Sequence, residues 1–318
     1  MRTLTFLLGL AVLAAVPVAA QDYPVRPIHV IAPFGPGTAT DTVARVVAAE
    51  LSRLTGQAVI VDNKPGAEGQ IGAQAAAAAP PDGYTIFVTT QTTQAINQHV
   101  YKTLLYDPVK SFAPISGLSS GAQIVMVRND LPVKSIADLI ALARAQPGKL
   151  SFGSGNGSAR GAAELFKIMA KVDLLGVPYK TQPQVIADLL GGRIDVTFSD
   201  FTTGLPPVRD GRARGLAVTS PQRYPSLEQF PTVAESGLPG YESRPWNAAY
   251  APAGTPRPII EKLNQLIREA VASEGYRRLL STTLGVPFPG SPEELAAFQA
   301  SETLKWGEVV RIAGMKEP

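Results

Sequence analysis

Short apolar runs alternate with stretches of helical periodicity along the sequence, and this alternation limits the fold more than any other feature. Apolar runs lie at residues 27–32, 59–62 and 84–89. Between them, apolar residues recur every three or four positions at 43–54 and 71–79. Strands that alternate with helices in this way are typical of a parallel sheet covered by helices. The chain is therefore predicted to have the α/β fold class.

The second half of the chain repeats this order of elements. Further apolar runs lie at 150–153, 174–179 and 194–199, with helical periodicity at 162–170 and 185–190. A chain of 318 residues is also long enough for two domains. We therefore expect two α/β lobes.

Capping residues indicate where some of the helices begin and end. Gly56 follows the first periodic segment and is expected to end that helix, while Ser135 is expected to begin a helix at 136–143. Near the C-terminus, amphipathic helices are predicted at 259–271 and 292–313.

Two glycine-rich loops, at residues 35–40 and 153–158, each follow a predicted strand and precede a predicted helix. The N-terminus of a helix carries unpaired N–H groups and a partial positive charge, so such a junction favours a carboxylate or phosphate. Neither loop has the Gly-Lys-Ser/Thr of a P-loop or a complete G-x-G-x-x-G. Two interpretations stay open at this point: an anion-binding pair of loops, or two ordinary tight turns.

The composition excludes several classes of chemistry. The sequence has no cysteine, which removes disulfides, thiolate zinc sites, iron–sulfur clusters and cysteine nucleophiles. Its 29 Lys+Arg and 26 Asp+Glu nearly balance, and Arg277-Arg278 is the longest basic cluster. We therefore expect no nucleic-acid partner. The two histidines, His29 and His99, lack the spacing of a zinc pair, so no metal and no cofactor are expected.

Gly117-Leu-Ser-Ser-Gly121 matches the G-x-S-x-G elbow of serine hydrolases, with Ser119 as the candidate nucleophile. In that fold the catalytic histidine follows the serine, but both histidines precede it here. The elbow also needs a helix directly after it, whereas 122–127 is predicted to be a strand. We interpret the match as chance and expect no catalytic residues, although an exported serine hydrolase stays the alternative from the enzyme class.

The N-terminal segment is predicted to be a signal peptide over residues 1–20. Arg2 supplies the positive region, residues 4–15 the apolar region, and residues 18–20 a small-residue exit with cleavage before Gln21. Later apolar stretches are too short, or carry charges or proline, so the mature protein is not expected to be inserted in a membrane. We expect an exported, periplasmic protein.

Two aspartates, Asp41 and Asp200, are candidate functional residues because of their positions next to predicted elements. Asp41 lies in the first turn of a predicted helix, where it complements the helix dipole. Asp200 follows the apolar run at 194–199, at the carboxyl end of a strand, where open α/β sheets place ligand contacts. Position alone leaves open whether Asp200 contacts a ligand.

The order and number of short motifs resemble the Bug family, which comprises periplasmic solute-binding receptors associated with tripartite tricarboxylate transporters. Among them are Pro-Phe-Gly-Pro-Gly at 33–37 and Pro-Asp-Gly-Tyr-Thr at 81–85. The resemblance spans nearly the whole mature chain. Its other segments lie at 23–28, 63–67, 71–72, 106–108, 147–149, 164–166, 177–180 and 252–256.

The resemblance implies a two-lobed periplasmic binding protein of the type II, Venus-flytrap class, with its ligand in a cleft between the lobes. We expect lobe 1 to comprise residues 21–121 and 222–318, and lobe 2 residues 122–221. Such a receptor captures a small organic carboxylate (a di- or tricarboxylate or an aromatic acid) by lobe closure and delivers it to membrane permease subunits. We expect a monomer. Presentation of the ligand to a membrane sensor kinase is the alternative.

Combining the loops with the resemblance predicts a set of ligand-binding residues. Thr38 stands where the family commonly has glycine, and Arg160 stands where a histidine is frequent. Arg160 could bind a distal carboxylate with both guanidinium N–H pairs or could simply be solvated. The predicted set is Phe34, Gly37, Thr38, Ala39, Thr40, Asp41, Thr90, Gln91, Thr92, Ser154, Gly155, Asn156, Ser158, Arg160, Tyr179 and Asp200.

Overall fold

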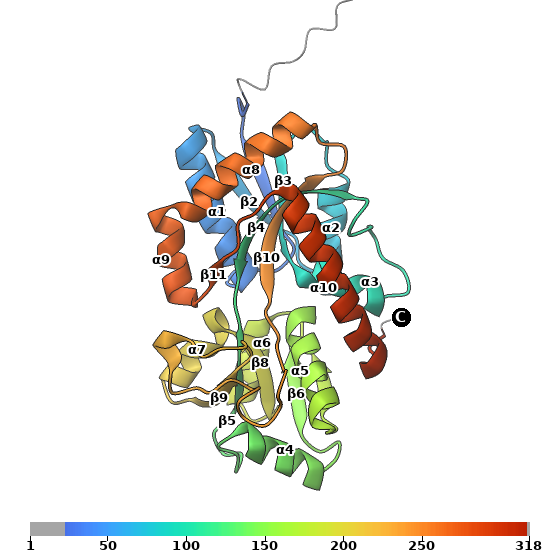
Figure 1. The fold of residues 1–318 in the computed structure, drawn as a ribbon, viewed down its shortest axis with the longest axis vertical. Coiled ribbons are helices and arrows are strands. Elements are labelled where there is room, and N and C mark those ends of the chain that lie inside the picture. The colour runs from blue at the N-terminus through green and yellow to red at the C-terminus, as the bar shows by residue number, and fades with distance from the viewer. Residues whose placement is uncertain (1–22, 317–318) are drawn as a thin grey trace, which may run out of the picture.

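Two β-sheets organise the computed structural model, which describes residues 23–316 (Figure 1). The predicted signal peptide at residues 1–20 lies outside the described residues. Among these residues, no helix is both long and apolar enough to cross a membrane. The first sheet contains β1 (Ile28–Ala32), β2 (Val59–Asn63), β3 (Thr85–Thr90), β4 (Phe112–Ser120), β10 (Trp246–Pro252) and β11 (Val286–Pro287). The second contains β5 (Gln123–Arg128), β6 (Ser151–Ser154), β7 (Leu175–Pro178), β8 (Val196–Asp200) and β9 (Ala213–Val218).

Each sheet combines parallel strands with an antiparallel part. The first sheet has the order β11-β4-β10-β3-β1-β2, in which β1 pairs in parallel with β2 and β3 while β10 runs antiparallel to β3 and β4. The second has the order β7-β6-β8-β5-β9, in which β6 pairs in parallel with β7 and β8. The predicted α/β class and the two lobes are thus confirmed.

Helices cover both faces of the first sheet, so its strands are apolar on both sides. In β10, for example, Ala249 and Ala251 point to the core beneath one set of helices, whereas Ala248 and Tyr250 point to the other core. The first set is α1 (Ala39–Thr55), α8 (Arg257–Ala272) and α9 (Glu274–Thr283). The second is α2 (Gln70–Ala77), α3 (Asn97–Val100) and α10 (Pro292–Ala313), with a 3-10 turn at Ala67–Gly69 and a π-helical turn at Thr92–Ile96.

The second sheet is covered in the same way. In β5, Val125 and Val127 face one core, and Ile124 and Met126 face the other. The helices over the first core are α4 (Ile136–Ala145) and α5 (Gly157–Ala170), and those over the second are α6 (Gln182–Leu190) and α7 (Phe201–Arg209). A short 3-10 turn lies at Pro225–Leu227.

Most of the predicted helices are present, and their caps explain where they begin. The final helix spans 292–313 as predicted, and the Ser135 hydroxyl accepts a hydrogen bond from the Asp138 N–H at the start of α4. Gly56 ends α1 with a φ of 70°, a left-handed conformation that glycine adopts without strain. The prediction for α5 was wrong at its start. This helix begins at Gly157 rather than 162, because Asn156 caps it through a bond to the Ala159 N–H.

The polypeptide passes between the sheets at two places in the described chain, from β4 to β5 and from the segment after β9 back to β10. The two crossing segments lie side by side, because the Gly121 N–H donates to the Pro245 carbonyl at 3.0 Å. The Thr219 hydroxyl joins them further, donating to the Ser243 carbonyl and accepting from the Gln123 N–H. These hydrogen-bonded crossings connect the two lobes.

The division into lobes at residues 121 and 221 stays a prediction, and we propose a later return to lobe 1. Val233, Leu238 and Tyr241 pack into the core of the second sheet. The Tyr241 hydroxyl also donates to the Ala162 carbonyl in α5. Residues 222–243 therefore belong with lobe 2 in this proposal, and the chain returns to lobe 1 near Pro245.

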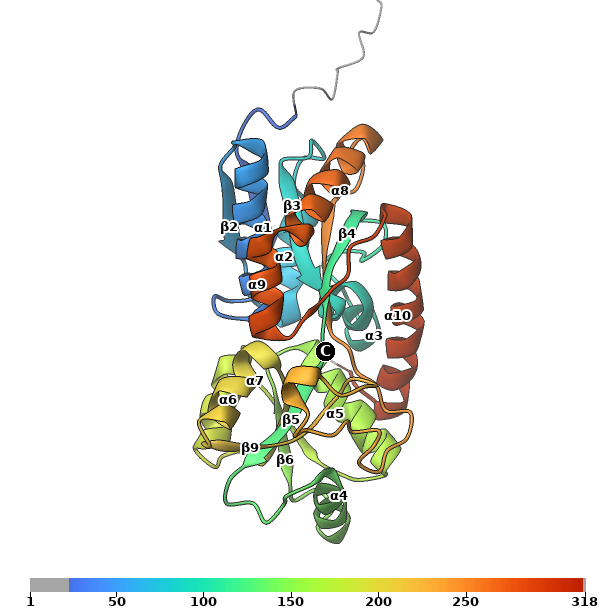
Figure 2. The ribbon, with the colours of Figure 1, turned by 60° about the vertical axis from the view of Figure 1, so that its left-hand side comes forward.

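Helix α10 packs on the first sheet and also reaches α5 of the other lobe (Figure 2). Trp306 is fully buried, and its indole N–H donates to Glu302 at 3.0 Å. A Cβ atom added at Gly161 of α5 would lie 2.7 Å from the Trp306 ring. Glycine at this position therefore lets the two helices pack closely, and this contact joins the lobes outside the crossing strands.

Candidate functional site

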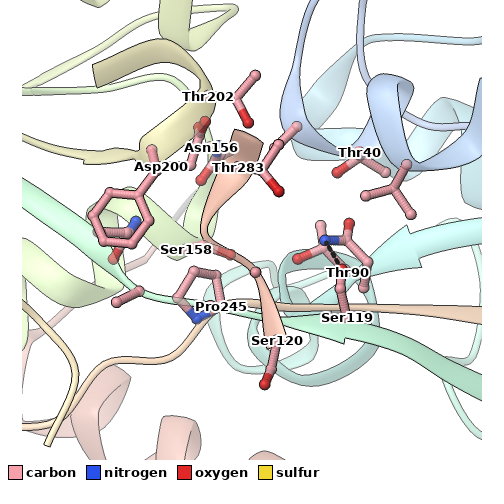
Figure 3. Close-up of a pocket in the computed structure, with 18 of the residues that line it drawn as sticks. Thr40, Thr90, Ser119, Ser120, Asn156, Ser158, Asp200, Thr202, Pro245 and Thr283 are labelled. Atoms are coloured by element: carbon pink, nitrogen blue, oxygen red, sulfur yellow. Dashed lines mark hydrogen bonds between the residues drawn. The ribbon is translucent and has the colours of Figure 1, made fainter. Parts of the chain in front are cut away.

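Among the described residues, three helices begin at one cavity between the lobes. They are α1 from lobe 1 and α5 and α7 from lobe 2, and their first residues line the cavity together with the crossing strands (Figure 3). We call this space the hinge cavity; its volume is about 90 Å³. It is lined by Ala39, Thr40, Val43, Thr90, Ser119, Ser120, Gly121, Ala122, Gln123, Asn156, Ser158, Ala159, Asp200, Phe201, Thr202, Pro245, Asn247, Thr283 and Gly285.

The first of these helix starts is held in place by a buried carboxylate. Asp41 accepts hydrogen bonds from the Gly37 N–H, the Asn63 side-chain amide and the Arg45 guanidinium. Burial alone would raise the pKa of the Asp41 carboxyl, but the bonds from Arg45, Asn63 and Gly37 outweigh it and lower the pKa. Asp41 therefore stays ionised and braces the loop that leads into α1.

Thr38 caps the same helix. Its hydroxyl donates to the Gly35 carbonyl at 2.8 Å and accepts from the Asp41 N–H at 3.4 Å. The loop thereby aims the start of α1, at Ala39 and Thr40, into the hinge cavity. N–H groups in a first helical turn have no acceptor within the helix, so they are available to an anion there.

The start of α5 is completed by a residue from the opposite lobe. The Thr92 hydroxyl oxygen accepts a hydrogen bond from the Ser158 N–H at 3.1 Å and lies 3.2 Å from the Ser158 hydroxyl. A Cβ added at Gly157 would lie 2.8 Å from the Thr92 methyl group, so the loop fits against Thr92 only with glycine there. Thr92 and Ser158 therefore form a direct contact between the lobes beside the cavity.

The third helix start, that of α7, is capped by Asp200. Its carboxylate accepts from the Thr203 N–H and the Thr203 hydroxyl, each at 3.1 Å. Burial raises the pKa of the Asp200 carboxyl, and the bonds from Thr203 oppose that rise without cancelling it. Asp200 therefore takes up a proton more readily than an ordinary aspartate, and it lines the hinge cavity.

A second cavity, of about 590 Å³, also lies between the lobes. We call it the aromatic cavity, because Phe34 from lobe 1 and Tyr179 from lobe 2 both line it. The Tyr179 hydroxyl donates to Asp188 at 2.9 Å, which leaves its ring as the group that faces this space. The other lining residues are Gly35, Pro65, Gly66, Glu68, Gly69, Gly155, Pro178, Lys180, Thr181 and Gln184.

The predicted ligand-binding residues fall into three groups. Ala39, Thr40, Thr90, Asn156, Ser158 and Asp200 line the hinge cavity. Phe34, Gly155 and Tyr179 line the aromatic cavity. The remainder line neither space and stay predictions as ligand contacts: Gly37, Thr38, Asp41, Gln91, Thr92, Ser154 and Arg160.

Several residues of the third group have other roles in the structure. Gly37, Thr38 and Asp41 bond with one another or with their own loop, and Thr92 bonds to Ser158. Gln91 differs, because its side chain is fully buried and neither atom of its amide has a hydrogen-bond partner among the described residues. A buried amide of this kind is usually satisfied by a water molecule or a ligand.

Sequence reasoning missed the lining residues of the crossing strands. Ser119, Ser120 and Gln123 come from one crossing, and Pro245 and Asn247 from the other (Figure 3). These segments lie far apart in the sequence, and the hydrolase-like motif at 117–121, which was interpreted as chance, gave no sign of a ligand site. The signal that could have found them is their place where the chain changes sheets. Thr202 was also missed, although it directly follows the predicted residue Asp200.

The serine of the hydrolase-like motif lies in a strand that leads into another strand. Ser119 belongs to β4, which continues into β5, so the strand–helix turn of an elbow is not formed there. His29 contacts Asp62 at 2.9 Å and His99 contacts the Thr303 carbonyl at 3.0 Å, and neither histidine lines the hinge cavity. Within residues 23–316, no three His, Cys, Asp or Glu residues cluster in a way that could hold a metal ion.

The sequence model of the "Tripartite tricarboxylate transporter family receptor" matches residues 43–315. The chain belongs to this receptor family. The match confirms the resemblance stated above, and it identifies the two-lobed architecture as that of a solute-binding receptor of the periplasmic binding-protein type.

Relatives cover almost the full length of the chain. The protein BugT of Bordetella pertussis is 33% identical over 305 residues, which is 95% of this chain and 94% of BugT. The structure "R. palustris Rpa4515 with adipate" superposes with a TM-score of 0.88 at 36% identity, covering 92% of this chain and 99% of that one. MatC from Rhodopseudomonas palustris with bound malate gives a TM-score of 0.85 at 29% identity, with coverages of 91% and 100%.

Proposed function

We propose that this receptor captures a small organic carboxylate in the hinge cavity and delivers it to the permease subunits of a tripartite tricarboxylate-type transporter. The convergence of three helix N-termini on one space carries this proposal. No lysine or arginine is among the described residues that line the hinge cavity, so the positive potential for an anion comes from peptide groups. The proteins with adipate and with malate support a carboxylate as the ligand class.

Capture depends on contacts from both lobes. Thr40 and Thr90 face the cavity from lobe 1, while Asn156 and Ser158 face it from lobe 2. A ligand that bonds to both sides stabilises the closed arrangement by the contacts that are absent when the lobes separate. Closure is therefore the signal that a permease would recognise, after export of the chain by its N-terminal segment.

The test removes one N–H donor from the cavity. Ala39 is the first residue of α1, where proline is well tolerated because the ring fits the helical φ. The preceding Thr38 is already extended, with φ −78° and ψ 161°, as a residue before proline must be. Ala39→Pro therefore deletes the donor and preserves the helix.

The control places the same change at an equivalent position away from the cavity. Glu274 is the first residue of α9, and the preceding Ser273 has φ −68° and ψ 160°. Calorimetric titration with succinate, malate and adipate is expected to show weakening by roughly tenfold or more for Ala39→Pro, since a bond to a charged group contributes about 1.5–3 kcal/mol. Glu274→Pro should bind like the parent protein. Parent protein that binds none of these acids would refute the proposed ligand class.

A further inference from the structure

The aromatic cavity and the hinge cavity are lined by neighbouring residues of the same two loops. From lobe 1, the segment after β1 contributes Phe34 to the aromatic cavity and Ala39 to the hinge cavity. From lobe 2, Gly155 lines the aromatic cavity and the adjacent Asn156 lines the hinge cavity. Consecutive Cα atoms are about 3.8 Å apart, so the two cavities are neighbours in the structure.

The two cavities differ in volume, so they suit different parts of a ligand. The hinge cavity has a volume of about 90 Å³, which suits a carboxylate and a few carbon atoms. A cavity of roughly 150 Å³ is a size known to hold benzene, so the hinge cavity cannot take a ring as well. The aromatic cavity, at about 590 Å³, has ample room for one.

The walls of the aromatic cavity are suited to a planar apolar group. Phe34 and Tyr179 contribute rings from opposite lobes, and Pro65 and Pro178 add apolar surface, again one from each lobe. The bond from the Tyr179 hydroxyl to Asp188 holds that ring in position. Aromatic pairs gain free energy in offset or edge-to-face arrangements beyond the burial of their area.

Glycine at position 69 lets the lobe 1 wall of this space pack closely behind Phe34. A Cβ at Gly69 would lie 3.3 Å from the end of the Phe34 ring and 2.8 Å from the Thr93 methyl group. The neighbouring residues Ala67 and Glu68 have φ values of 47° and 53°, which are unusual for residues other than glycine. Such strained conformations concentrate at ligand-binding segments.

From these observations we propose that the aromatic cavity is a second subsite, which binds the ring-bearing body of a carboxylate whose anionic head lies in the hinge cavity. The inference rests on the proposed function, because the hinge cavity must first hold the head. It makes the substrate class more specific: an organic acid that carries an aromatic or similarly bulky apolar group.

The experiment compares two probes with the same anionic head, succinate and phenylsuccinate. Calorimetric titration of the parent protein is expected to show phenylsuccinate binding at least tenfold more tightly, because the phenyl group leaves water for an apolar cavity. Gln184→Trp fills the aromatic cavity from the exposed start of α6. This variant should lose at least tenfold in affinity for phenylsuccinate and stay within twofold for succinate.

Matched control variants show whether a loss of binding comes from general damage to the fold. Gln265→Trp places the same bulk on the exposed face of α8, outside both cavities, and should bind both probes normally. Tyr179→Phe keeps the ring and should keep the preference for phenylsuccinate, whereas Tyr179→Ala should lose it. Each variant is checked by circular dichroism and thermal unfolding before titration.

The possible outcomes distinguish failure of the aromatic subsite from failure of the proposed carboxylate capture. Equal affinity of the parent for the two probes, or an equal loss for both probes in Gln184→Trp, would overturn the aromatic subsite and leave carboxylate capture intact. Failure of the parent protein to bind succinate, phenylsuccinate, malate or adipate would overturn both proposals.

Discussion

Thr92 in lobe 1 caps the N-terminus of a helix in lobe 2, because its hydroxyl oxygen accepts the Ser158 N–H at 3.1 Å. Both residues are buried at the edge of the hinge cavity. This hydrogen bond joins the two lobes directly. If the lobes close around a ligand as proposed, the bond contributes part of the free energy of closure.

Thr92→Val keeps the shape of the side chain and removes the acceptor. We expect carboxylate affinity to fall by roughly three- to tenfold, since a neutral hydrogen bond contributes about 0.5–1.5 kcal/mol, and we expect ligand release to accelerate. Stopped-flow dissociation and calorimetry measure both changes. Thr282→Val, on exposed α9, is the control, because its hydroxyl bonds only within its own helix, to the Arg278 carbonyl. Unchanged affinity in Thr92→Val would show that the contact does not contribute to closure.

Asp41 gives stability that depends on pH. Its folded pKa is lowered, because bonds from Arg45, Asn63 and the Gly37 N–H outweigh the effect of burial. A lowered folded pKa stabilises the protein above the unfolded value near 3.8, and this contribution is lost as the pH falls through the folded pKa. Asp41→Asn should lower the free energy of unfolding by about 1–3 kcal/mol at pH 7.

Urea unfolding at several pH values measures this effect. The difference between Asp41→Asn and the parent should shrink below pH 3.8. Asp210→Asn is the control, since Asp210 forms an exposed ion pair with Arg212 at 3.3 Å and such pairs contribute little. A difference between Asp41→Asn and the parent that is constant from pH 7 to pH 3 would contradict the assigned role.

Asp200 should couple ligand binding to a proton. Burial raises its folded pKa above 3.8, so an arriving carboxylate meets a group that is readily neutralised. We expect affinity for a fully ionised diacid to increase as the pH falls toward the Asp200 pKa, with proton uptake on binding. Calorimetry in two buffers of different ionisation enthalpy measures that uptake.

Asp200→Asn isolates this charge, because asparagine is as good a helix cap as aspartate and preserves the bond to the Thr203 N–H. The variant should bind plain diacids at least as tightly as the parent and show no proton uptake. Asp210→Asn again serves as the control. The same proton uptake in Asp200→Asn and the parent would assign the proton to another group.

Local pattern was sufficient to predict most elements of the fold. Helix α10 begins with Ser291 and Pro292 and ends before Gly314, signals that act within one turn of chain. Helix α7 was not predicted, because it contains Pro206 and Pro207 and proline has a very low propensity for the interior of a helix. Its apolar face packs through Phe201 and Leu205 into the second core, and that packing overrides the propensity.

The candidate site was predictable only in part, because local sequence pattern does not show which distant segments pack together. Thr40 and Asn156 were identified because each lies at a glycine-rich strand–helix junction, which is visible in a few residues. Thr92 and Ser158 stay predictions as ligand contacts, and the hydrogen bond between them was not predicted. Asn247 was missed because only its pairing with Thr90 across two strands places it at the cavity.

Short-range sequence pattern was enough for the α/β class, the two repeated units and the glycine-rich loops at 35–40 and 153–158 as anion-binding candidates, because these depend on interactions between near neighbours. The meeting of three helix starts at one cavity, and the bonds by which Asp41 and Thr38 brace their own loop, became visible in the folded structure. The same holds for the aromatic cavity, which neighbours the hinge cavity. Such relationships depend on how the chain crosses twice between sheets, and no short-range pattern encodes the contacts that this crossing creates.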